Sequence, residues 1–115
     1  MPAPIVFFDI AGPDIANQSA FYRTVFGWEV GPDGRFSAPV TAPLSGTLRA
    51  DPAEKVIYIG VDDVTATLAK IVANGGAVVA PRFEIKGVVV LALFTDPAGN
   101  RLGLVEMAGA APKIP

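Results

Sequence analysis

Glu106 is the residue whose type and position most clearly suggest chemistry in this chain. It closes the segment 93–106, in which two apolar runs flank Asp-Pro-Ala-Gly-Asn, a sequence typical of a tight turn. The segment predicts a β-hairpin, so Leu102, Leu104 and Glu106 should share one face of its second strand. A carboxylate at the end of an inward face could accept a ligand proton, bind a cationic group or ligate a metal. The alternative is an acid at the end of a strand that faces solvent.

The chain lacks the residue types that most often perform acid–base and thiol chemistry. Its 115 residues include no histidine and no cysteine, which excludes Ser-His nucleophiles, thiol chemistry, disulfides and Cys-ligated metals. The net charge is -2 and the nine Lys and Arg residues do not cluster, so a nucleic-acid partner is not expected. No run is long enough to span a bilayer, and the first residues do not resemble a signal peptide. We therefore expect a cytoplasmic protein without a membrane partner.

Two helices are expected to position these candidates, one after Asp14 and one after Asp63. Each acid is a suitable N-cap, and a glycine follows each helical stripe, at Gly27 and at Gly75-Gly76. The neighbouring Asp62 is assigned to the same helix start, where acids complement the helix dipole, and not to a catalytic pair. Expected strands cover 5–10, 28–30, 56–61, 77–80 and 88–95, followed by the second hairpin strand, with 81–87 as a loop and 35–54 as the least regular part.

The two halves of the chain repeat one pattern. Asp14 precedes Gly27 by 13 positions, and Asp63 precedes Gly76 by 13. Each half reads strand, capped helix, glycine and further strands, which predicts two βαβββ modules packed as a pseudo-symmetric pair. The modules would cover about 4–50, in abbreviated form, and about 55–107. The sequence thus predicts a single α+β domain over residues 1–115.

Three segments, in this order, make the chain resemble the vicinal oxygen chelate superfamily of glyoxalases, bleomycin-resistance proteins and extradiol dioxygenases. They are 19–30, then 61–64 with Gly75-Gly76, then 96–106. The resemblance implies an eight-stranded, incompletely closed barrel whose curved sheets enclose a cavity, usually completed in a dimer.

The resemblance also implies metal-ligand positions, most of which this chain does not fill. Members typically hold a divalent metal with histidines on the first strand of each half and carboxylates on the last. Carried over, these positions fall on Phe7, on or near Val56, and on Glu106, with no acid at 47–50. Asp9 shares strand parity with Phe7 and could point into the same cavity as Glu106, but two acids are too few for an oxygen-ligated site. We expect no cofactor, with a divalent metal as the alternative.

Aromatic residues could line the implied cavity. The resemblance places Phe7 and Tyr58 near its wall, where they could contact a flat or apolar ligand, oriented by the Tyr58 hydroxyl. The alternative is that these rings simply fill the core. For Trp28 we expect a core or dimer contact.

The sequence thus predicts metal-free binding of a small organic ligand, by sequestration, as in the resistance proteins of this superfamily. The expected ligand-binding residues are Phe7, Asp9, Val56, Tyr58 and Glu106. Two alternatives stay open: a glyoxalase-type lyase or isomerase with Glu106 as catalytic base, and a ligand-free structural dimer. A homodimer is expected for all three functions, because open sheet edges are commonly covered by a partner.

Overall fold

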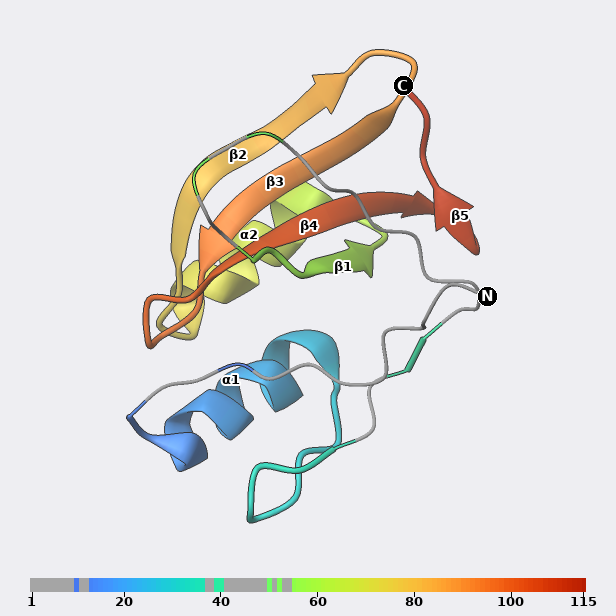
Figure 1. The fold of residues 1–115 in the computed structure, drawn as a ribbon. Coiled ribbons are helices and arrows are strands. Elements are labelled where there is room, and N and C mark those ends of the chain that lie inside the picture. Colours follow the sequence, from blue (N-terminus) through green and yellow to red (C-terminus); the bar gives the residue numbers. More distant parts are fainter. Residues whose placement is uncertain (1–9, 11–12, 37–38, 41–49, 51, 53–54) are drawn as a thin grey trace.

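The computed structural model describes residue 10, residues 13–36, 39–40, 50 and 52, and residues 55–115. Within these ranges the chain forms two helices and one five-stranded sheet (Figure 1). The elements are α1 (Ile15–Phe26), β1 (Tyr58–Val61), α2 (Val64–Ala73), β2 (Ala77–Ile85), β3 (Val89–Thr95), β4 (Arg101–Ala108) and β5 (Ala111–Pro112). In this part of the chain, neither helix has the length and apolarity needed to cross a membrane.

The sheet contains the predicted second module. Its strand order is β1-β4-β3-β2, with β1 parallel to β4, the other pairs antiparallel, and β5 added to the end of β4. β1, α2, β2, β3 and β4 therefore form one βαβββ unit, and the described strands make an open sheet in a mixed α+β fold. Of the expected first module, α1 is described, whereas most of the strand expected at 5–10 and most of 37–54 lie outside the described residues.

Both helices begin at the predicted acids. The Asp14 carboxylate accepts a hydrogen bond from the Asn17 N–H at 3.0 Å, and the Asp63 carboxylate accepts one from the Ala66 N–H at 2.9 Å. These bonds satisfy backbone donors that the first helical turn leaves unpaired. Helix α1 ends at Gly27, whose φ of 69° is a left-handed conformation that glycine adopts without steric cost.

Two predicted segments differ from the structure. The loop expected at 81–87 is wrong, because β2 continues through Pro81 to Ile85. Pro81 is tolerated because β2 is an edge strand and its register with β3 shifts on both sides of Ala80, so no regular ladder needs a proline N–H. The strand expected at 28–30 is also wrong: Trp28 stacks between Tyr22 and Phe36, with ring centroids 5.2 and 5.1 Å away, and the segment is held by side chains.

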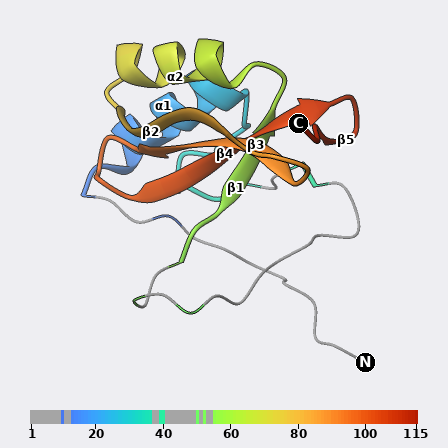
Figure 2. The same ribbon diagram turned by 90° about the horizontal axis from the view of Figure 1, so that it is seen from above.

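The core lies between the helices and one face of the sheet. Figure 2 shows α1 and α2 on the same side of the strands. The largest side chains buried there are Phe94, Ile71, Leu102, Leu104, Val64 and Val90, joined by Phe21 and Tyr22 of α1.

Candidate functional site

The strand register assigns each predicted site residue to one face of the sheet. Ile59 pairs with Leu104 and Val61 pairs with Glu106, and these positions share the helix-covered face with the core. Tyr58 precedes Ile59 by one residue and pairs with Gly103, which precedes Leu104 by one. Because side chains alternate along a strand, Tyr58 belongs to the opposite face. Tyr58 and Glu106 consequently do not line a common chamber within this sheet.

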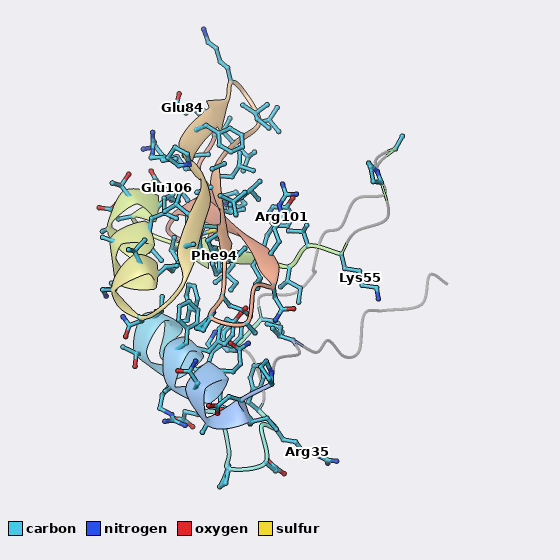
Figure 3. All side chains as sticks on the ribbon, turned by 90° about the vertical axis from the view of Figure 1, so that its left-hand side faces the viewer. Arg35, Lys55, Glu84, Phe94, Arg101 and Glu106 are labelled. Atoms are coloured by element: carbon cyan, nitrogen blue, oxygen red, sulfur yellow. The ribbon has the colours of Figure 1, made fainter. Side chains whose placement is uncertain are left out.

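Glu106 is buried and surrounded by donors. Its side chain is on the side of the sheet where α2 lies (Figure 3), and the residue is only 8% exposed. Oε2 accepts from the Val64 N–H at 3.2 Å and from Arg82 Nε at 3.1 Å, while Oε1 accepts from Arg82 Nη2 at 3.3 Å. Lys113 Nζ lies 3.5 Å from Oε1. The predicted surface of Leu102, Leu104 and Glu106 is confirmed, and the acid is not in solvent.

These partners set the electrostatics of Glu106. The Arg82 hydrogen bonds are the main cause that lowers the pKa of the Glu106 carboxyl, assisted by the Val64 N–H and by Lys113 and opposed by burial. A general base at neutral pH works best with a pKa near the operating pH, so this environment is poorly suited to proton abstraction.

The residues present also do not fit the family's metal site. Both Glu106 oxygens already face cationic or N–H donors, and the described ranges contain no group of three or more His, Cys, Asp or Glu that could hold an ion. Val56 is half-buried just before β1, and Phe7 and Asp9 lie outside the described residues. The residues around Glu106 therefore do not support a metal-dependent reaction step.

A second buried acid, Asp96, links α1 to the turn between β3 and β4. It is 2% exposed and accepts hydrogen bonds from Gln18 Nε2 at 2.8 Å, Tyr22 Oη at 3.1 Å and Asn100 Nδ2 at 3.0 Å. The Ala98 and Asn100 N–H groups donate to its other oxygen. Burial, together with the Asp96 charge, raises the pKa of the Tyr22 hydroxyl. Because all these donors bind its carboxylate, Asp96 has a structural role. We call Asp96 and its side-chain partners Gln18, Tyr22 and Asn100 the Asp96 joint.

The sheet face opposite the helices, which we call the distal face, has a different character. The register places Phe83, Leu91, Val105 and Gly60 in one row across the sheet and Leu93, Gly103 and Tyr58 in the next. Met107 joins them, because its thioether lies over Gly60. Tyr58 is 50% exposed and Phe83 is 39% exposed. None of these eight residues is charged, so they offer apolar contact area and two aromatic rings. Arg101, which pairs with Thr95 at the start of β4, lies on the same face and brings a positive charge to its end.

Comparison with known proteins identifies the family. Residues 5–105 match the family model described as "Glyoxalase-like domain". The chain belongs to the glyoxalase-like domain family. This membership confirms the resemblance to the vicinal oxygen chelate superfamily.

Relatives of this glyoxalase-like domain include longer proteins. "Putative glyoxylase CFP32" of Mycobacterium tuberculosis (strain CDC 1551 / Oshkosh) is 32% identical over 111 residues, a match that covers 84% of this chain and 42% of that protein. "Anthracycline biosynthesis protein DnrV" of Streptomyces peucetius is 26% identical over 137 residues, covering 93% of this chain and 50% of that protein. The chain thus spans about half the length of the curated relatives it matches.

Solved structures show the same fold. A glyoxalase-related enzyme from Fulvimarina pelagi superposes with a TM-score of 0.64 at 17% identity, covering 92% of each chain. The lactoylglutathione lyase from Agrobacterium tumefaciens superposes with a TM-score of 0.56 at 20% identity, covering 91% of this chain and 94% of that one. At these identities the likeness concerns fold.

Sequence reasoning missed several residues of this glyoxalase-like domain. Phe83 fell within the expected loop, and Arg82 with it. Gly60 and Gly103 carried a usable signal, since a glycine inside a strand often marks a close approach of another group. Asp96 appeared only as a turn residue, because nothing in the local sequence shows that α1 lies against it.

Proposed function

We propose that this chain binds a small organic molecule on the distal face of its sheet. The observation that carries the proposal is the group of eight uncharged residues on that face, which presents the rings of Tyr58 and Phe83 partly exposed and has Arg101 at its end. Small-molecule sites are typically lined by apolar and aromatic side chains with few polar groups. The Tyr58 hydroxyl supplies one such polar group at the rim.

We further propose that the distal face lines the cavity of an incompletely closed, eight-stranded barrel made of two βαβββ modules, and that the protein acts as a homodimer. An open sheet with exposed rings, whose outer strands β1 and β2 have no further partner strand among the described residues, would gain by being covered. The curated relatives are about twice as long as this chain, so two copies would match their length. The twofold difference in length between this chain and its relatives supports two such domains acting together.

Binding without a bound metal is the activity that we favour over lyase or isomerase chemistry. Glu106, the expected base, is held by Arg82 and Lys113 on the helix-covered face, and the same contacts disfavour it as a metal ligand. One group of relatives is named for anthracycline biosynthesis, which is consistent with a role in handling small organic molecules.

The test is binding of N-phenyl-1-naphthylamine, an uncharged dye whose fluorescence rises in apolar sites. We expect saturable enhancement with the native chain and roughly five- to tenfold weaker binding in Phe83→Asp, because the new carboxylate must lose water when the dye binds. The matched control is Val72→Asp, which adds the same charge at an exposed residue of α2, behind the sheet. Absence of saturable enhancement in the folded native chain, or equal loss in the two variants, would contradict binding at the distal face.

A further inference from the structure

The Tyr58 ring lies flat against the sheet. A Cβ atom placed on Gly103 would collide with ring carbons Cδ1 and Cε1 and would come within 3.3 Å of Cγ, so the ring covers the β4 backbone at that glycine. One side of the ring is therefore packed on the strand. Because the residue is nevertheless 50% exposed, the other side of the ring faces outward.

Met107 makes the reciprocal contact. A Cβ on Gly60 would lie 2.8 Å from Met107 Sδ and 2.9 Å from its Cγ, so this side chain of β4 crosses the backbone of β1. Each of the two strands thus supplies one long side chain and one glycine. The result is a low, uncharged surface of one phenol ring and one thioether, which we call the β1–β4 platform (Tyr58, Gly60, Gly103 and Met107).

We propose that the β1–β4 platform binds planar ring systems by stacking on Tyr58, an inference that rests on the proposed function and specifies its ligand class. A flat ligand can contact the whole outward side of a flat-lying ring, whereas a puckered one touches it at a few atoms. Thioether sulfur also makes favourable contacts with aromatic rings, so Met107 extends the surface. The four residues of the platform carry no charge, and Arg101, which pairs with Thr95 two residues before Gly103 on β4, lies on the same face of the sheet.

The experiment compares two competitors that differ in planarity. 2-Naphthol and decahydro-2-naphthol have the same carbon skeleton and one hydroxyl group, and the saturated compound is at least as apolar, so burial of apolar area alone would not favour the planar one. Each is titrated against N-phenyl-1-naphthylamine bound to the full chain. We expect 2-naphthol to displace the dye at a concentration roughly three- to tenfold lower, the range of a single aromatic contact.

Three variants assign the preference to the platform. Tyr58→Leu should remove the preference for 2-naphthol, while Tyr58→Phe, which keeps the ring, should retain it. Gly103→Ala should also remove it although Tyr58 is present, because the new methyl group lifts the ring from the strand. Circular dichroism checks that each variant is folded, and the exposed position of Tyr58 makes its two variants the safer pair.

The outcomes separate the two proposals. Dye binding with equal competition by the two naphthols, or a preference that survives in folded Tyr58→Leu, would overturn the stacking platform and leave binding at the distal face standing. A preference that tracks the ring, lost in Tyr58→Leu and kept in Tyr58→Phe, supports the platform. Absence of dye binding in the native chain would overturn the proposed function and the platform together.

Discussion

Glu106 joins four segments of the chain through one carboxylate. It stands on β4, receives the first N–H of α2 at Val64, pairs with Arg82 of β2 and lies beside Lys113 in the C-terminal segment. Arg82 approaches through two nitrogens, one to each oxygen, an arrangement that fixes direction as well as charge. The carboxylate therefore fixes the start of α2 against the sheet.

Replacing this carboxylate should weaken the fold and spare ligand binding. Glu106→Gln keeps the size of the side chain and loses the charge, and we expect a decrease of about 1.5–3 kcal/mol in the free energy of unfolding, the range for hydrogen bonds to charged groups. Urea denaturation measures the change. Glu84→Gln is the control, because Glu84 contacts the same arginine but is exposed, and such pairs contribute little. Loss of dye binding by folded Glu106→Gln at unchanged stability would show instead that the acid takes part in binding.

The stability supplied by Glu106 should depend on pH. Because its pKa in the folded chain lies below the ordinary value of 4.5, the unfolded chain binds the proton more readily. The contribution is complete above the ordinary value and is lost as the pH falls through the lowered pKa of the folded state. Denaturation of the native chain and of Glu106→Gln at several acidic pH values should therefore give converging stabilities, and a constant difference would contradict this account.

At the scale of elements, the Asp96 joint connects α1 to the hairpin of the second module. Gln18 and Tyr22 are both on α1, and both donate to the same carboxylate oxygen of Asp96 at the end of β3. Phe26 of α1 also lies beside Phe94 of β3, with ring centroids 6.2 Å apart, so the helix makes polar and aromatic contacts with this part of the chain. Together they hold α1 against the second module.

The Tyr22 hydroxyl should resist ionisation while this joint is intact. Burial and Asp96 raise its pKa above the ordinary 10.0, so its contribution to stability is complete below that pH and is lost as the pH rises. In Tyr58→Phe, Tyr22 is the one tyrosine left of two. Alkaline titration of that variant should show tyrosinate absorbance only together with unfolding, followed by circular dichroism. A reversible titration near 10.0 in the folded protein would contradict the joint.

Elements defined by local signals could be predicted from the sequence. The caps at Asp14 and Asp63, the glycine that ends α1 and the turn at 96–100 all follow from residues adjacent in the chain. The continuation of β2 through Pro81 could not, because it depends on β2 being an edge strand with irregular pairing. The conformation of 28–30 likewise depends on rings that meet Trp28 from other segments.

The candidate site illustrates the same limit. Strand alternation predicted that Leu102, Leu104 and Glu106 share a face, and they do. Alternation alone does not tell which face the helices cover, so the sequence does not show that Glu106 and Tyr58 lie on opposite faces of the sheet. The distal face became visible only when β1, β2, β3 and β4 were placed side by side.

At the scale of the whole molecule, the open sheet and the length of the relatives lead to a prediction of oligomeric state. β1 and β2 form the two edges of the described path of strands, and the curated relatives are about twice as long as this chain. We expect sedimentation equilibrium at micromolar concentration to give twice the monomer mass of 11.9 kDa. A monomeric mass across the concentration range would contradict the homodimer, and Val72→Asp serves as a control for nonspecific association.

The crossing of Tyr58 over Gly103 restricts how this protein can diverge. Any side chain gained at position 103 would need the space that the phenol ring occupies, so the two positions cannot change independently. Homologues that carry a larger residue at the site of Gly103 should have exchanged the aromatic residue at the site of Tyr58 for a small one. A lineage that recruits position 103 for new chemistry would therefore have to give up the ring first.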